Sequence, residues 1–269
     1  MTVSNALPIA NAQSSTANLL METAEILQIL QEGEFEVEGV LPWSSNYAFL
    51  VTMCLDGADV VAVYKPRRGE RPLWDFTTGT LCQREQAAFL VSEGLGWQLI
   101  PPTVLRDGPH GIGSVQLFIQ HNPENHYFTF EGSDIHRQQL QQMALLDVVI
   151  NNADRKSGHV LLEEAEDETA IPTTMPVRIW GIDHGICFHS DYKLRSVIWE
   201  FAGWPIPDEM LEELTQLQQL LTQPDNPLLL NVLLSPDELT AMQRRLDKLL
   251  RQKIFPQPGP GRHYPWPPV

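Results

Sequence analysis

Two aspartates and a histidine stand at a spacing that suits the transfer of a phosphoryl group. Asp154 follows an apolar helical segment, His159 comes five positions later, and a short apolar run follows. Asp183 closes a second apolar run and is followed two positions later by Gly185. Phosphoryl transfer requires a carboxylate beside the acceptor hydroxyl and two further groups that hold metal ions on the phosphates. These three residues supply those groups in that order, although Asp-His-Gly alone also fits an ordinary turn.

A lysine earlier in the chain provides a positive charge for the phosphates. Lys65 ends the apolar run Asp59-Val-Val-Ala-Val-Tyr64. A lysine that follows a buried strand projects into the cleft that the sheet covers, where it can hold phosphate oxygens as a point charge. Glu85 lies near the start of a predicted helix, where it can pair with this ammonium. A solvated lysine at a strand end is the alternative reading.

A loop of small polar residues comes one hairpin before this lysine. Ser44, Ser45 and Asn46 lie between two predicted strands. Backbone N–H groups and hydroxyls in such a loop can approach phosphates closely. The position of the loop therefore predicts that these three residues contact the nucleotide, whereas the loop by itself would indicate only a turn.

The elements that must position these residues form two groups, which makes the fold class α+β. The expected strands cover 35–41, 47–55, 60–65, 103–106 and 114–120, and the expected helices cover 17–31, 80–93, 133–150, 208–221 and 235–253. Asp56-Gly57 predicts a hairpin turn between the second and third strands. Ser235-Pro236-Asp237-Glu238 has the N-cap, proline and acidic residues typical of a helix start.

A polar, proline-containing break at 120–126 indicates the boundary between two lobes. We therefore predict a flexible lead-in over 1–16, a nucleotide-binding lobe over 17–122 and a catalytic lobe over 123–254. The tail over 255–269 contains six prolines, which exclude a helix. It is expected either to be disordered or to lie along the catalytic lobe with Trp266 as an anchor.

The composition restricts the location and the partners. The chain has 269 residues and a formal net charge of −16, and no basic patch attracts nucleic acid. Its three cysteines include no Cys-x-x-Cys pair, which favours reduced thiols in the cytoplasm. No apolar run is long enough for a transmembrane helix, and the N-terminus lacks the pattern of a signal peptide.

Together these motifs resemble those of the bacterial phosphatidylinositol 3- and 4-kinase-like (PI3/PI4-kinase-like) family of the protein-kinase-like superfamily. The resemblance runs from about Phe35 to Lys253. It rests on Ser44-Ser-Asn-Tyr-Ala-Phe49, Val-Ala-Val-Tyr-Lys65-Pro, Arg84-Glu85, Asn152-Ala-Asp154-Arg155 and Ile182-Asp183-His-Gly185. It implies a two-lobed kinase-like fold, with an antiparallel sheet and a helix in the first lobe and a largely helical second lobe.

The resemblance also implies an ATP-dependent kinase that transfers the γ-phosphoryl group to a hydroxyl, with Mg²⁺ or Mn²⁺ as the metal. Lys65 would hold the phosphates and Glu85 would orient it. Asp154 would position the acceptor hydroxyl, and Asp183 would bind the metal. We expect a protein Ser/Thr or a small alcohol as acceptor rather than a phosphoinositide, because an acidic protein approaches an anionic membrane poorly.

Two residues depart from the family pattern. The family usually has Asn at the position of His159, and often His at the position of Lys156. Imidazole is a poorer ligand for Mg²⁺ than an amide oxygen and suits Mn²⁺ better. An unperturbed imidazole titrates near pH 6.5, so proton and metal are expected to compete there. The departure at His159 also favours an alternative function, an ATP-binding pseudokinase that acts as a regulatory interaction module.

Overall fold

An antiparallel sheet forms much of the first half of the chain in the computed structural model, which describes residues 21–41, 46–164, 177–223 and 227–269. Its strands are β1 (Glu34–Val40), β2 (Phe49–Leu55), β3 (Ala58–Pro66), β4 (Thr103–Gly108) and β5 (Gly111–Leu117). They lie in the order β1-β2-β3-β5-β4, and every neighbouring pair is antiparallel. The expected strands are confirmed.

The hairpin between β2 and β3 follows from its two turn residues. Asp56 and Gly57 both have positive φ, 51° and 85°, which matches the twist of a two-residue hairpin turn. The register that this turn sets buries Val60, Ala62 and Tyr64 on one face of β3. Because side chains alternate along a strand, Lys65 points to the opposite face.

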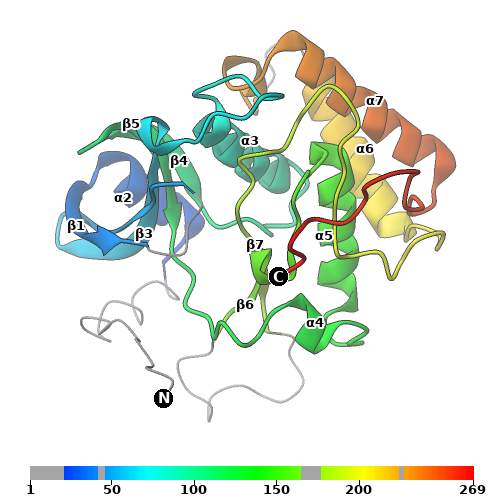
Figure 1. The fold of residues 1–269 in the computed structure, drawn as a ribbon, viewed down its shortest axis with the longest axis horizontal. Helices are drawn as coiled ribbons and strands as arrows, with labels where there is room; N and C mark the ends of the chain where they lie inside the picture. The colour runs from blue at the N-terminus through cyan, green and yellow to red at the C-terminus, as the bar shows by residue number, and fades with distance from the viewer. Residues whose placement is uncertain (1–20, 42–45, 165–176, 224–226) are drawn as a thin grey trace.

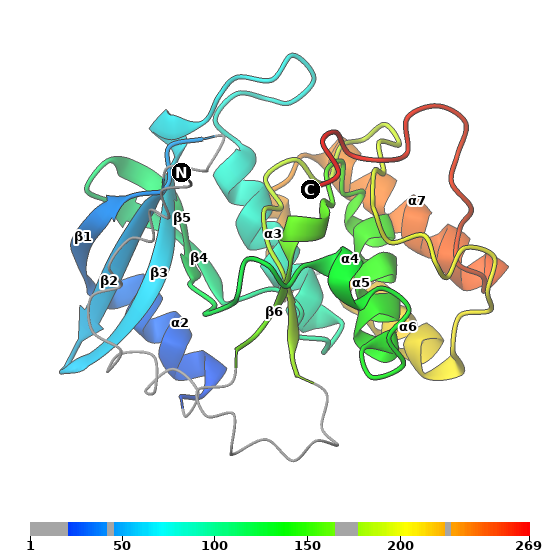
Figure 2. The same cartoon turned by 60° about the horizontal axis from the view of Figure 1, so that its bottom comes forward.

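Two helices contact this sheet. Helix α2 (Thr23–Glu32) packs against β2, β3, β4 and β5, and Figure 2 shows it lying along one face of the sheet. Helix α3 (Leu81–Gly94) contacts β4 and β5, yet its buried residues Ala88, Phe89 and Val91 belong to the apolar cluster of the helical half. Helix α3 is therefore part of the core that lies beyond the sheet.

The second half of the chain is mainly helical (Figure 1). Its elements are α4 (Tyr127–Phe130), α5 (Arg137–Ile150), β6 (Val160–Leu162), β7 (Ile179–Gly181), α6 (Asp208–Thr222) and α7 (Pro236–Gln252). Short 3₁₀ turns lie at η1 (Arg67–Gly69), η2 (Ser157–His159) and η3 (Leu230–Val232). The whole is an α+β fold with the sheet in the first lobe and most of the helices in the second, as expected. No helix in the described ranges is long and apolar enough to cross a lipid bilayer.

Local signals set both ends of the long helices. Helix α7 begins at the predicted N-cap with a capping box, in which the Ser235 side chain accepts from the Glu238 N–H and the Glu238 carboxylate accepts from the Ser235 N–H. Helix α5 begins at Arg137, later than predicted, after the separate turn of α4. It ends at Asn151, whose φ of 54° turns the chain toward the cleft.

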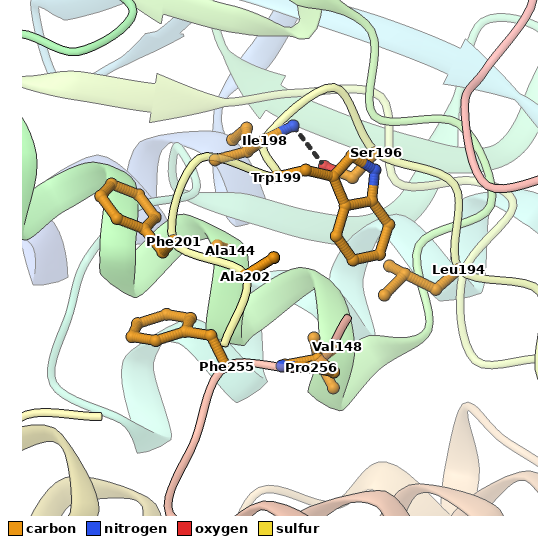
Figure 3. Close-up of a pocket in the computed structure, with 10 residues that line it drawn as sticks. All are labelled: Ala144, Val148, Leu194, Ser196, Ile198, Trp199, Phe201, Ala202, Phe255 and Pro256. Atoms are coloured by element: carbon orange, nitrogen blue, oxygen red, sulfur yellow. Dashed lines mark hydrogen bonds between the residues drawn. The ribbon is translucent and has the colours of Figure 1, made fainter. Parts of the chain in front are cut away.

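The proline-rich tail lies along the helical half, which is one of the two expected alternatives, but Trp266 does not anchor it. Trp266 is 77% exposed, whereas Phe255 is 3% exposed and Pro265 is buried. Phe255 and Pro256 meet Val148 of α5 around a cavity of about 10 Å³, which is room for about one water (Figure 3). The anchor is therefore the first aromatic residue of the tail, which the core of the helical half buries.

The tail then returns to the middle of the molecule, where both views place the end marked C (Figures 1 and 2). The His263 carbonyl accepts from the Ser196 N–H at 3.1 Å, and the Pro268 carbonyl accepts from the Ser157 N–H at 2.8 Å. Because Ser157 opens η2, three residues after Asp154, the tail is hydrogen-bonded to the segment that carries the candidate catalytic residues.

Candidate active site

A cleft of about 190 Å³ lies between the sheet and the helical half. Residues from both halves line it, among them Asn46, Lys65, Glu85, Asp154 and Asp183. Five of the residues selected from the sequence therefore share one cavity. Ser44 and Ser45 lie outside the described residues, and Asn46 uses its side-chain oxygen to accept the Arg71 N–H at 3.0 Å, which holds the loop after η1.

Lys65 lies between two carboxylates. Its Nζ donates to Glu85 Oε1 at 2.7 Å and to Asp183 Oδ1 at 3.1 Å. Burial alone would lower the pKa of Lys65, but the charges of Asp183 and Glu85 more than offset it and raise the pKa above its usual value. Lys65 is therefore a permanent cation at the centre of the cleft.

Asp183 follows β7 and lies in an unusual backbone conformation. Its φ is 61°, in the left-handed region that non-glycine residues seldom adopt and that Asp tolerates better than most. The ammonium of Lys65 holds the pKa of this carboxyl well below its usual range despite burial. Asp183 is therefore anionic, and its side chain is 44% exposed toward the cleft.

A buried arginine holds the segments of the site together. Arg155 is fully buried and donates to both carboxylate oxygens of Asp147 on α5, at 2.9 and 3.0 Å. Its Nη1 also donates to the carbonyls of His159 and Ile182, at 3.0 and 3.2 Å. Because Ile182 precedes Asp183, this one guanidinium fixes the distance between the two segments that carry His159 and Asp183.

Asp154 is the second aspartate that lines the cleft. Its side chain is 24% exposed, and its Oδ2 lies 3.4 Å from Lys156 Nζ. Burial raises the pKa of Asp154 to about 6, although the positive charge of Lys156 partly opposes this. A carboxylate with a pKa near the working pH is suited to accept a proton from a hydroxyl.

His159 and Asp183 face each other, and neither of the two facing atoms, Nε2 and Oδ2, carries a hydrogen. Its Nδ1 lies 2.8 Å from the Asp154 carbonyl, which can only accept, so Nδ1 carries the hydrogen and Nε2 keeps its lone pair. Burial lowers the pKa of His159 to about 4, so the ring is neutral at pH 7. The expectation that His159 titrates near pH 6.5 is therefore wrong, because it ignored this burial.

The pair suits a divalent cation. His159 Nε2 and Asp183 Oδ2 are 3.5 Å apart, and both are acceptors, so a cation between them would satisfy both. The described residues contain no group of three or more His, Cys, Asp or Glu placed to hold a metal ion. A metal held by His159 and Asp183 would therefore need further ligands from phosphate oxygens and water, as nucleotide-bound metals do.

Sequence reasoning assigned no role to the residues that support this site, although Arg84 and Arg155 lie within its motifs. Asp147 and Arg155 carry the internal hydrogen bonds, and Arg84 ties α3 to the helical half. One signal was present, since Asp147 is an acidic residue inside an apolar helical pattern, which indicates a buried partner. Nothing in the sequence indicated the partner of Arg84, which lies 154 positions away.

Comparisons with known proteins agree with this geometry. Residues 106–221 match the family described as phosphatidylinositol 3- and 4-kinase. Protein Rv2133c of Mycobacterium tuberculosis is 37% identical over an alignment of 272 positions, which spans 89% of this chain and 94% of that protein. Phosphatidylinositol 4-kinase gamma 4 of Oryza sativa is 27% identical over 138 residues, which cover 45% of this chain and only 22% of that kinase.

A solved structure shows the same fold. The Golgi casein kinase with Mn/ADP bound has a TM-score of 0.54 and 18% sequence identity, over 85% of this chain and 74% of that one. Similarity at this level identifies a shared fold and leaves the activity to the site. The sequence matches and the kinase-like fold together show that this chain belongs to the phosphatidylinositol 3- and 4-kinase-like family, whose kinase domain implies ATP-dependent phosphoryl transfer.

Proposed function

We propose that this protein is an active kinase that transfers the γ-phosphoryl group of ATP to a hydroxyl of a protein Ser/Thr or a small alcohol. One observation carries the proposal. The pair of Lys65 and Glu85, the anionic Asp183 and the partly protonated Asp154 meet in one cleft. These groups would perform three different tasks, namely holding the phosphates, holding the metal and receiving the acceptor.

The residues of the cleft divide the reaction among them. Lys65 would hold the phosphate oxygens, and Asp154 would orient the acceptor hydroxyl. The acceptor oxygen forms a bond to the γ-phosphorus while the bond from that phosphorus to the bridging β–γ oxygen breaks, which releases ADP. The hydroxyl proton passes to Asp154. A divalent cation held by His159 and Asp183 would neutralise the charge on the phosphates.

The choice of acceptor rests on charge. The formal net charge of −16 repels anionic lipid headgroups, which favours a water-soluble acceptor in the cytoplasm. The Mn/ADP complex of the Golgi casein kinase and the imidazole of His159 both favour Mn²⁺ as the cation.

Transfer from γ-labelled ATP tests the proposal. The assay has three acceptor arms, an unfolded Ser/Thr-rich protein, a set of small alcohols and phosphatidylinositol vesicles, each with Mg²⁺ and with Mn²⁺. Label in either soluble arm, absent in Asp154→Asn, supports the proposal. Label in the vesicle arm alone overturns the choice of acceptor. ATP binding without transfer in any arm favours the pseudokinase. That alternative is based on His159, which stands where the family usually has Asn.

A further inference from the structure

Arg84 connects the helix that carries Glu85 to the helical half of the molecule. Its side chain is 3% exposed, and its Nη1 donates to the Cys187 carbonyl at 2.8 Å. Its Nη2 pairs with Glu238 Oε1, and its guanidinium lies over the Phe76 ring, 5.0 Å from the ring centroid. All of these contacts lie outside the sheet that carries Lys65.

Glu238 serves two helices with its two oxygens. Oε2 accepts from the N–H and the hydroxyl of Ser235, both at 2.9 Å, which closes the capping box of α7. Oε1 is left for Arg84. Burial alone would raise the pKa of Glu238, but the Ser235 N–H and the Arg84 guanidinium hold the pKa below its usual value. The first turn of α7 thus presents a fixed anion to α3.

Neighbouring residues on a helix point in directions about 100° apart, so Arg84 and Glu85 face different partners. Glu85 Oε1 accepts from Lys65, and Glu85 Oε2 accepts from the His184 N–H at 3.0 Å. Since α3 is a rigid helix, contacts that fix the direction of Arg84 also fix the direction of Glu85. We propose that Arg84, held by Glu238, is a positioning residue that keeps Glu85 against Lys65 for nucleotide binding.

The surroundings of α3 support this role. The loop before α3 is held by the helical half as well, because Asp75 pairs with Lys193 at 2.9 Å and its carbonyl lies 2.8 Å from His189 Nε2. Ala87, Ala88, Phe89 and Val91 of α3 belong to the helical cluster, although the helix also contacts β4 and β5. Helix α3 is therefore anchored to the half that carries Asp154 and Asp183, and the pair of Lys65 and Glu85 is formed at 2.7 Å.

The test compares two single variants, each of which removes the partner of one carboxylate oxygen of Glu238. Arg84→Met removes the ion pair between α3 and Glu238 and leaves the capping box of α7 intact. Ser235→Ala removes the capping hydroxyl and leaves the contact with Arg84. The full-length proteins are compared by the Kd for ATP with Mn²⁺, by kcat and by the melting temperature. We expect Arg84→Met to raise the Kd about tenfold, as for the loss of one hydrogen bond to a charged group, and Ser235→Ala to leave it within about twofold.

Equal Kd values for the two variants would overturn the proposal, because Arg84 would then matter only for stability. If Arg84→Met does not fold, Arg84→Lys is scored in the same way, since lysine keeps the charge but cannot reach Glu238 and Cys187 together. The proposal rests on the role of Lys65 in the proposed function. If the wild-type protein binds ATP no better than Lys65→Met does, the proposed function itself is contradicted. If the wild-type protein binds ATP and the Arg84 variants bind it with the same Kd, only the role of Arg84 is contradicted.

Discussion

At the scale of single residues, the two aspartates of the cleft carry opposite pKa shifts. Burial raises the pKa of Asp154 to about 6, whereas Lys65 holds the pKa of Asp183 well below its usual range. A pair of carboxyls whose pKa values diverge is a common sign of divided roles in catalysis. One of them can exchange a proton near neutral pH, and the other stays ionised to hold a cation.

The first prediction concerns the pH dependence of transfer. Asp154 must be ionised to accept a proton, so kcat should fall about tenfold per pH unit below a pH of about 6. The measurement is kcat from pH 4.5 to 8 with saturating ATP and Mn²⁺. His159→Asn should keep this acid limb, because His159 is already neutral there. An acid limb that disappears in His159→Asn would assign it to the histidine instead.

The second prediction concerns stability. A carboxyl whose folded pKa is raised destabilises the folded state above that pKa, and this cost disappears as the pH falls below it. Asp154→Asn should therefore raise the free energy of unfolding at pH 7 by about 1–3 kcal/mol, with a smaller gain at pH 4. Urea unfolding at both pH values measures it. A destabilised Asp154→Asn protein at pH 7 would contradict the raised pKa.

The third prediction concerns the metal. In His159→Asn an amide oxygen would face Asp183, and hard Mg²⁺ prefers oxygen ligands. The ratio of kcat/KM with Mn²⁺ to that with Mg²⁺ should therefore fall by about tenfold or more. Lys156→Gln serves as a control, since Lys156 contacts Asp154 and does not face the metal pair. An unchanged ratio would remove His159 from the metal site.

At the scale of elements, the sequence was most informative where the signals are local. The alternation along β3 placed Lys65 on the face opposite Tyr64, and Asp56-Gly57 defined the register. The N-cap, the proline and the acidic residues over 235–238 predicted the start of α7 within one residue. In each case, neighbouring residues determine the conformation, so a single sequence was sufficient.

The contacts that hold the site are mostly not local, and these could not be predicted. Glu238 meets Arg84 across 154 positions, and Pro268 meets Ser157 although no pattern joins them. The pKa of His159 depends on burial by several segments, so the expected value near 6.5 was wrong. Residue types and spacing were sufficient to choose the site residues. Their contacts and pKa values could be obtained only from the tertiary structure.

The fourth prediction concerns the tail as an element. Deletion of residues 261–269 removes the carbonyls that accept from Ser196 and Ser157 but keeps Phe255 and Pro256 in the core. The loss of two main-chain hydrogen bonds beside Asp154 should lower kcat about tenfold and leave the Kd for ATP within about twofold. Trp266→Ala is the control, because its side chain is exposed. An unchanged kcat in the deletion would mean that the tail does not position the loop.

At the scale of the whole molecule, the nucleotide would bind between two halves with separate apolar clusters. One cluster joins α2 to the sheet, and the other joins α3 to the C-terminal helices. Lys65 lies on the sheet that the first cluster covers, and Glu85, Asp154 and Asp183 lie beside the second cluster. A ligand that contacts all four would tie the two halves together.

The fifth prediction follows from this arrangement. ATP with Mn²⁺ at a hundredfold excess over Kd should stabilise the folded state by about 2.7 kcal/mol, which raises the melting temperature by roughly 5–10 °C. Lys65→Met and Asp183→Asn should reduce this shift, and Asp154→Asn should keep it. No shift in the wild-type protein with millimolar ATP and either metal would contradict the assignment of the cleft.

The hydrogen bond from Ser157 to Pro268 has a practical consequence for producing this protein. Only Val269 would separate an affinity tag fused to the C-terminus from the Pro268 carbonyl, which accepts from Ser157 in the segment next to Asp154. Immobilisation through such a tag would transmit any pull on the resin or sensor surface directly to that segment. Surface-based binding assays are better served by an attachment point away from this tail.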